Sequence, residues 1–485
     1  MITKIQKGDF KMVNTQHTDV LQWDVTNLSN AFKQKQISPA EVTGTLLEQI
    51  DRINPELNAY ITVMYEQAME SARKAEREIA SGNWKGPLHG VPIGLKDLIY
   101  TKSVRTTMGS KIFKDYIPDF DAAVVEKLTQ VGAVIIGKLN THEFAYGPTG
   151  DRSAFGAVKN PHHLSKISGG SSSGSGAAVS AALCYAALGT DTGGSIRIPS
   201  SCCGIVGMKP TFGRVSKYGV YPLSWTLDHV GPMTRTVLDN ALLLNVLSGY
   251  DERDPYSMKT DEEDFTRFIG QSIKGSVIGV PSSFYFDHVE EEVEQQVQHA
   301  LKVFESLGAE MRVIDLPHIQ QFSLAQQITI RSEAYTVHED MLRDQSEQYD
   351  QEVRERLLTG MDEKAHTYVH AQQLRHVAVQ EFKQAFNEAD VIVTPTLPIL
   401  PPDIGQREVH IHGNKEYVRS ALLRLTSPTN FNGFPSISVP CGFSESGLPI
   451  GMQLIGKPFD EANLYRFAYA FEQESSIPNV KMDIV

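Results

Sequence analysis

The chain has few cysteines and few tryptophans for its length. Its 485 residues include 4 cysteines and 3 tryptophans. The cysteines are Cys184, Cys202, Cys203 and Cys441. None stands in Cys-x-x-Cys spacing, and three lie in segments that we expect to be buried. We therefore expect free thiols in a reducing compartment and no disulfide framework.

The sequence also lacks an excess of positive charge and a long apolar run. Lysines and arginines number 45 against 58 aspartates and glutamates, which gives a formal net charge of −13. Such a charge provides no general attraction to nucleic acid or anionic lipid. No stretch approaches the roughly 18 apolar residues of a membrane-spanning helix. We therefore expect a cytoplasmic protein that contacts no membrane and binds no nucleic acid directly.

Composition and periodicity predict a single α/β domain. Hydrophobic residues make up 41% of the chain and charged residues 21%, and no linker divides it. Helical segments, such as the one that begins at Ser38-Pro39-Ala40-Glu41, alternate with short apolar runs such as 133–136. This alternation is typical of βαβ units. We expect residues 20–485 to form the domain and the polar residues 1–19 to be a disordered or extended lead.

Two clusters of glycine and serine, at 169–176 and 193–195, lie within an apolar stretch. Because helix-forming and strand-forming residues adjoin them, these glycines belong to a folded core and not to a linker. Gly193 and Gly194 leave the neighbouring backbone amides unscreened, and amides directed at one point stabilise an oxyanion. We predict Ser195 as a nucleophile, with an oxyanion hole formed by the backbone amides of Thr192, Gly193, Gly194 and Ser195.

Other chemistries have weaker support from the residues. The segment 170–174 matches Gly-x-Ser-x-Gly around Ser172, but no hydrophobic strand leads into it. The segment 132–139 resembles a phosphate-binding loop, but it lacks the Ser or Thr that would hold Mg²⁺ and has the pattern of a buried strand. His142 and Glu143 have no further ligand at metal-site spacing, so we interpret them as loop structure.

Lys96 lies among apolar residues in a short β-type run at 87–98. Desolvation lowers the pKa of a buried lysine, and the neutral amine that results is a base. Taken alone, these residues favour a surface turn formed by Lys96 and Asp97, because lysine is almost never buried without a partner.

Three segments together resemble those of the amidase signature family: GVPIGLKD with Lys96, GGSSSGSGAA with Ser171, and GTDTGGSIRIPSS with Ser195. The resemblance extends from about residue 24 to residue 472. It implies a Ser-Ser-Lys triad in which Ser195 attacks the amide carbon, Ser171 relays its proton, and Lys96 receives the proton as a neutral amine. It also implies a cis peptide bond between Gly170 and Ser171.

The resemblance further implies the architecture of the domain. We expect one large α/β domain with a central mixed, mostly parallel β-sheet of about eleven strands, covered by helices on both faces. We expect neither a metal nor a cofactor.

Within the family, GMKPTFGRVSKYGV, TLDHVGPMTRTV and the segment 368–375 look most like the glutaminase subunit of tRNA-dependent amidotransferases. In that subunit an arginine at the position of Arg375 holds the carboxylate of glutamine, and an aspartate at the position of Leu423 holds its amino group. Leucine cannot pair with an ammonium. We therefore expect a stand-alone amidase that acts on a small uncharged amide, a carbamate or an aryl amide, with the glutaminase subunit as the alternative.

The pocket is expected to take a small-molecule amide substrate. The loop before the first Gly/Ser cluster contributes to it, together with Arg375 and Leu423. The predicted substrate-binding residues are Gly147, Thr149, Gly150, Arg375 and Leu423. The sequence does not decide the oligomeric state, and a homodimer is one possibility.

Overall fold

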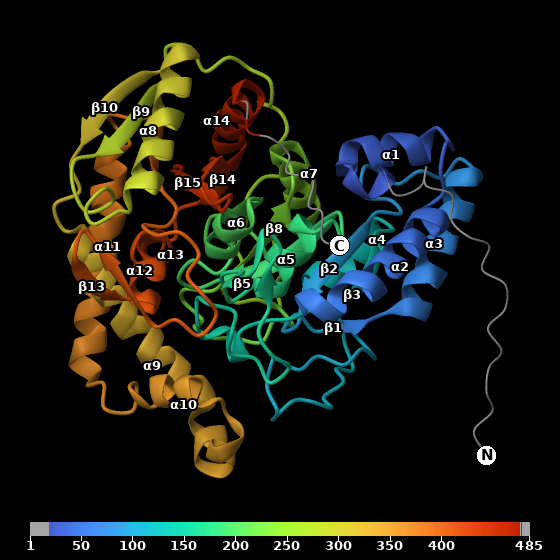
Figure 1. Cartoon of the computed structure of the whole chain (residues 1–485), viewed down its shortest axis with the longest axis horizontal. Helices are drawn as coiled ribbons and strands as arrows, with labels where there is room; N and C mark the ends of the chain where they lie inside the picture. Colours follow the sequence, from blue (N-terminus) through green and yellow to red (C-terminus); the bar gives the residue numbers. More distant parts are fainter. Residues whose placement is uncertain (1–18, 476, 478–485) are drawn as a thin grey trace.

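An eleven-stranded mixed β-sheet crosses the molecule, and helices lie on both of its faces (Figure 1). The computed structural model describes residues 19–475 and 477. The predicted lead therefore lies outside the described residues except for Asp19. Within the described part of the chain, no helix is long and apolar enough to span a membrane.

The sheet contains strands from every part of the chain, in the order β1-β3-β2-β6-β8-β7-β14-β15-β11-β9-β10. Its strands are β1 Tyr60–Val63, β2 Pro92–Lys96, β3 Val134–Leu139, β6 Ala186–Asp191, β7 Val206–Lys209, β8 His229–Thr234, β9 Val277–Pro281, β10 Glu310–Ile314, β11 Val391–Pro395, β14 Ser436–Phe443 and β15 Pro449–Ile455. Two separate hairpins are β4 Lys159–Asn160 with β5 His163–Ile167, and β12 Glu408–Ile411 with β13 Asn414–Tyr417.

The prediction of one α/β domain with a mixed eleven-stranded sheet is confirmed, and the structure locates its parallel parts. Strands β3, β2 and β6 pair in parallel, and so do β11, β9 and β10. The strands between these two groups pair antiparallel, as β8 does with β6 and β7, and as β14 does with β7 and β15. The parallel groups follow from the helical crossovers that the sequence pattern predicted.

The helices cover the sheet from both sides. They are α1 Val25–Lys33, α2 Pro39–Leu57, α3 Tyr65–Ala80, α4 Ala123–Gln130, α5 Ser173–Ser180, α6 Arg197–Cys203, α7 Val237–Leu247, α8 Glu291–Ser306, α9 Ile319–Gln345, α10 Gln351–Leu358, α11 Ala365–Ala385, α12 Val418–Arg424, α13 Ser427–Asn432 and α14 Glu461–Glu474. Short 3-10 turns occur at Asp19–Gln22 (η2), Glu143–Ala145 (η3) and Ser346–Gln348 (η4).

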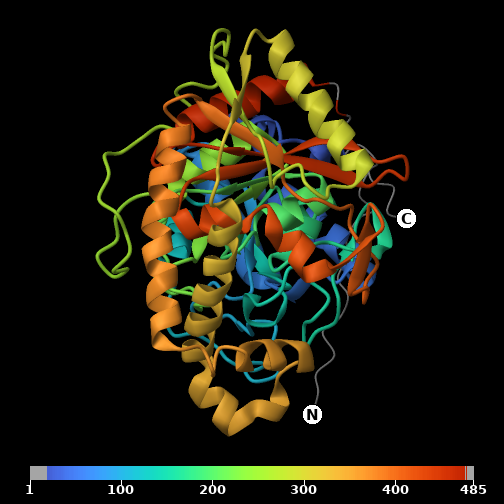
Figure 2. The ribbon, with the colours of Figure 1, turned by 90° about the vertical axis from the view of Figure 1, so that its left-hand side faces the viewer.

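Two groups of helices pack on the central strands. Helices α7 and α8 each contact α14, and all three contact the sheet, while α5 and α6 contact each other and the sheet. Helices α9 and α11 run side by side at one end of the molecule, with α10 at their lower end (Figure 2). This pair of long helices forms a wall beside the ends of the central strands.

Local capping explains where the predicted helices begin. Ser38 and Glu41 form a capping box at the start of α2, where the Ser38 side chain accepts the Glu41 amide and the Glu41 carboxylate accepts the Ser38 amide. Pro39 occupies the first turn, where its missing N–H leaves no helical hydrogen bond unmade. All four cysteines are free, as expected, and the fourth is buried as well as the three for which burial was predicted.

Candidate active site

Lys96, the last residue of β2, is completely buried beside two hydroxyl groups. Its Nζ lies 2.6 Å from Ser171 Oγ and 2.7 Å from Thr190 Oγ1. Burial lowers the pKa of Lys96 to about 7, although the charge of Asp191 opposes this shift. With this pKa about half of the amine is neutral near pH 7 and most of it at pH 8, and the neutral amine can accept a proton.

Ser171 follows a cis peptide bond at Gly170-Ser171, in the first Gly/Ser cluster. The position before it needs a glycine, because a Cβ on Gly170 would lie 2.7 Å from the amide nitrogen of Gly150. The two clusters are in contact, since the Ser172 amide donates to the Ser195 carbonyl at 3.3 Å. The Ser172 hydroxyl donates to the Thr190 carbonyl and accepts the Thr190 amide, so this hydroxyl is tied to the backbone of β6.

Asp191, the last residue of β6, holds the loop that carries Ser195. Its carboxylate accepts the amides of Gly194 at 2.8 Å and Ile196 at 3.1 Å. Arg197 forms a two-point ion pair with the same carboxylate: its Nε lies 3.0 Å from Oδ2 and its Nη2 lies 3.0 Å from Oδ1. Both side chains are fully buried. Burial alone would raise the pKa of Asp191, but the charge of Arg197 holds it below its ordinary range.

This clamp corrects one part of the predicted oxyanion hole. The Gly194 amide donates to Asp191 and is therefore not directed at a substrate. Thr192, Gly193 and Ser195 line a cavity of about 690 Å³. The predicted oxyanion hole is therefore reduced to the amides of Thr192, Gly193 and Ser195.

The other walls of this cavity come from distant parts of the chain. Residues 145–148, the first half of α9, the β12–β13 hairpin and α12 all contribute to the lining. On the side of the Ser195 loop, the Gln326 side chain of α9 donates to the Thr192 carbonyl at 3.2 Å.

Of the five predicted substrate-binding residues, Gly147 and Leu423 line the cavity. Thr149, Gly150 and Arg375 are not among its lining residues. The Thr149 hydroxyl donates to Asp151 at 2.6 Å, and the Gly150 amide donates to His142 Nδ1 at 3.3 Å.

Arg375 contacts the loop before β8 and the ring of Phe431 in α13, and it does not line the cavity. Its Nη2 donates to Thr226 Oγ1 at 2.9 Å, and its guanidinium lies 5.2 Å from the centre of the Phe431 ring. The Glu333 carboxylate accepts from the same Thr226 hydroxyl at 2.7 Å. These contacts give Arg375 a role in joining α11 to neighbouring segments.

Sequence reasoning missed two arginines that flank Tyr146, a residue of the cavity lining. The guanidinium groups of Arg356 in α10 and Arg419 in α12 lie 5.4 and 5.8 Å from the ring centre of Tyr146, a lining residue. Arg356 also donates to the Tyr146 carbonyl. Burial lowers the pKa of Arg356 to about 10 and also lowers the pKa of Arg419. No local sequence signal could have found this pair, because α10 and α12 bring their arginines to Tyr146 only in the folded chain.

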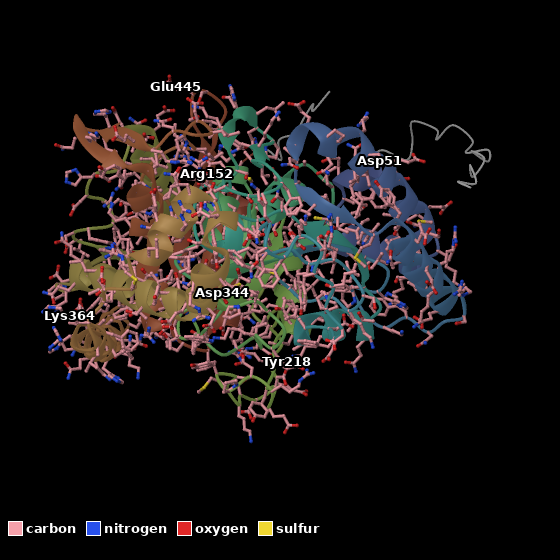
Figure 3. The ribbon with its side chains drawn as sticks, turned by 90° about the horizontal axis from the view of Figure 1, so that it is seen from below. Asp51, Arg152, Tyr218, Asp344, Lys364 and Glu445 are labelled. Carbon is pink, nitrogen blue, oxygen red and sulfur yellow. The ribbon has the colours of Figure 1, made fainter. Side chains whose placement is uncertain are left out.

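Ion pairs fix α10 beside the loop that contains Tyr146. Arg152, labelled in Figure 3, pairs with Glu352 in the first turn of α10. Arg407 also pairs with Glu352, with Nε 2.8 Å from the carboxylate, and its Nη1 lies 2.9 Å from Asp151. The loop at 145–152, α10 and the segment before the β12–β13 hairpin are thus held together at the cavity.

Nearly the whole chain is similar to proteins of a known family. The A subunit of a glutamyl-tRNA(Gln) amidotransferase from Geobacter sp. (strain M21) is 40% identical over 481 residues, which cover 94% of this chain and 98% of the relative. The prediction of a small-molecule substrate alone and no nucleic acid is therefore wrong, because proteins that match nearly the whole chain are named as parts of an amidotransferase of a glutamyl-tRNA.

Solved structures agree with this relationship. A chain from a vestigial protein complex related to an s-triazine catabolic enzyme has a TM-score of 0.91 and 32% identity, covering 95% of this chain and 100% of that one. The A subunit of the glutamyl-tRNA(Gln) amidotransferase from Thermotoga maritima has a TM-score of 0.81 and 32% identity, covering 98% and 100%. The family model described as Amidase matches residues 41–465. The chain therefore belongs to the amidase signature family of hydrolases.

Proposed function

We propose that the chain hydrolyses a carboxamide through an acyl-enzyme on Ser195, as the glutamine-hydrolysing subunit of a tRNA-dependent amidotransferase. The observation that carries the chemistry is the contact of 2.6 Å between Lys96 Nζ and Ser171 Oγ, at a lysine that burial makes a base. A serine hydroxyl becomes an effective nucleophile only when a base takes its proton.

In the proposed reaction, Ser195 Oγ attacks the amide carbon and passes its proton to Ser171 Oγ, which passes its own proton to Lys96 Nζ. The amides of Thr192, Gly193 and Ser195 stabilise the oxyanion that forms. When the C–N bond breaks, Lys96 returns the proton through Ser171 to the leaving nitrogen, and ammonia departs. Water then attacks the acyl-enzyme by the same proton route, which releases the carboxylic acid and restores Ser195.

The names of the relatives favour a glutaminase subunit over a stand-alone amidase for small uncharged amides. The cavity is consistent with this choice, because Arg419 is among its lining residues and would attract a carboxylate. We also propose a cytoplasmic location, which the four free, buried cysteines support.

The test combines labelling with transamidation. An electrophilic glutamine analogue should attach to Ser195, as mass spectrometry would show, and Ser195→Ala should remove both the label and all ammonia release. Mixed with the other subunits of a related amidotransferase, glutamyl-tRNA(Gln), and ATP to activate the glutamyl carboxylate, the chain should convert the charged tRNA to its glutaminyl form. A label on Ser172 or on a cysteine would contradict the assignment of the nucleophile. Absence of glutamine hydrolysis under all these conditions would contradict the proposed substrate.

A further inference from the structure

Thr192, in the Ser195 loop, lies between two cavities. It lines the active-site cavity and also a second cavity of about 320 Å³, which Asp228, the residue before β8, lines as well. The Thr192 hydroxyl donates to Asp228 Oδ1 at 2.6 Å, and such a bond to a carboxylate is stronger than one between neutral groups. Asp228 does not line the active-site cavity, so any effect that it has on a substrate there passes through Thr192.

The second oxygen of Asp228 fixes the loop that precedes it. Oδ2 accepts the amide of Leu223 at 2.9 Å and the amide of Ser224 at 3.0 Å. The Ser224 carbonyl accepts the amide of Asp228 at 2.9 Å, so the turn is closed in both directions. Because both carboxylate oxygens are engaged, the Thr192 hydroxyl meets an acceptor whose position and orientation are fixed.

Helix α9 holds the same loop with a second carboxylate. Glu333 is 5% exposed and accepts the Ser224 hydroxyl at 2.6 Å. It also accepts the amide of Thr226 at 3.1 Å and the hydroxyl of Thr226 at 2.7 Å. The Tyr368 hydroxyl of α11 donates to this carboxylate at 2.8 Å. The loop 223–228 is therefore clamped between the long helices and the Ser195 loop.

Thr192 joins two peptide groups, which carry the amides of Thr192 and Gly193. A peptide group is planar and trans, so its N–H points away from its C=O. Gln326 of α9 donates to the Thr192 carbonyl at 3.2 Å and thereby orients the Gly193 amide. Asn430 donates to the Asp191 carbonyl at 3.0 Å and thereby orients the Thr192 amide. The Thr192 side chain is the remaining anchor, because Gly193 has none, and it sets the place of the Cα between these two peptides.

We propose that Asp228 is a positioning residue for the hydrolysis, which holds the amides of Thr192 and Gly193 in place through the Thr192 hydroxyl. Glu333 supports it by fixing the loop 223–228. This inference rests on the acyl-enzyme chemistry of the proposed function and adds to it two residues outside the active-site cavity. Since an oxyanion exists only after the carbonyl is attacked, misplaced amides lower kcat and leave KM nearly unchanged.

The first test changes the Thr192 hydroxyl and measures kcat and KM for glutamine. Thr192→Val keeps the shape of the side chain and removes the donor, so kcat should fall about tenfold to a hundredfold. Thr192→Ser keeps the hydroxyl and should restore most of the rate. Asp228→Asn should lose as much as Thr192→Val, because the carboxamide turns an NH₂ group either to the Thr192 hydroxyl or to the amides of Leu223 and Ser224.

The second test asks whether the residues act through one another. The double variant Thr192→Val with Asp228→Asn should lose no more activity than the more damaged single variant. Glu333→Gln should lower kcat by a smaller factor in the unmodified enzyme and should have no further effect on Thr192→Val. A general structural role would instead give losses that multiply and a raised KM.

Ser216→Ala is a matched control. The Ser216 hydroxyl donates to Asp251 at 2.9 Å and is as deeply buried as Thr192, but Ser216 lines neither cavity. This variant should keep the kcat of the unmodified enzyme.

An unchanged kcat in Thr192→Val, or losses that multiply in the double variant, would overturn the inference and leave the proposed function standing if Ser195→Ala is inactive. An active Ser195→Ala would contradict both. If the unmodified enzyme hydrolyses butanamide and not glutamine, only the proposed substrate fails. The same comparison with butanamide then decides the role of Asp228, because an oxyanion forms with either amide.

Discussion

At the scale of single residues, the protonation of Lys96 determines when the enzyme can act. Burial lowers its pKa to about 7, so the amine is neutral above that pH and protonated below it. A protonated Lys96 cannot accept the proton of Ser171. We expect kcat/KM to fall about tenfold per pH unit below pH 7 and to level off above pH 8.

The measurement is a pH-rate profile from pH 5 to 9 on a slow amide, together with Lys96→Met, which should lose nearly all activity. Lys138 offers a matched control, since it is also buried, with its pKa lowered to about 8, but it lies 3.8 Å from Asp97 and outside the cavity. Lys138→Gln should keep the acid limb at the same pH. A wild-type rate that stays constant down to pH 5 would exclude a neutral lysine as the base.

A second prediction at this scale concerns the Asp191–Arg197 pair. Removing one member leaves the other charge buried without a partner, which typically costs about 3–5 kcal/mol. Asp191→Asn should lower the free energy of unfolding by about this amount, and should also lower kcat because Asp191 fixes the Gly194 and Ile196 amides. The double variant with Arg197→Met should lose less than the sum of the single losses in urea unfolding. Additive losses would show that the two side chains are not coupled.

At the scale of elements, local signals decide what can be predicted. The helix beginning at Ser38 and the strands at 133–136 and 390–395 are predictable because capping residues and apolar runs act within a few residues. The β12–β13 hairpin was missed, although Val409 and Ile411 alternate with polar residues before the turn at Gly413. This alternation, with a glycine between two short strands, was the available signal.

The residues of the active site also differ in whether the sequence could predict them. Lys96, Ser171 and Ser195 lie in distinctive segments, so their roles could be proposed from the chain alone, whereas the arginines around Tyr146 could not. Arg356 and Arg419 belong to helices whose sequences are ordinary, and they meet at Tyr146 only through tertiary packing. Arg375, which the family resemblance put in the pocket, is held instead by Thr226, outside the cavity.

At the scale of the whole molecule, the contacts of the 3-10 turn at Asp19–Gln22 bear on where the domain begins. The proposed domain begins at about residue 20, and the structure describes a 3-10 turn at Asp19–Gln22. Val20 and Leu21 in this turn are 4% and 3% exposed and belong to the main hydrophobic core. The Val20 carbonyl also accepts the hydroxyl of the buried Tyr185 at 2.9 Å.

The last prediction compares two truncations that differ by this turn alone. Removing residues 1–18 should leave the free energy of unfolding and kcat/KM unchanged, because Val20 and Leu21 keep their packing. Removing residues 1–22 should cost roughly 3–6 kcal/mol, since two apolar side chains of about 1.5–3 kcal/mol each lose their burial, and Tyr185 loses its acceptor. Urea unfolding of the two proteins measures the difference. Equal stabilities would show that the domain begins after this turn, and a loss already in the shorter truncation would give residues 1–18 a part in the fold.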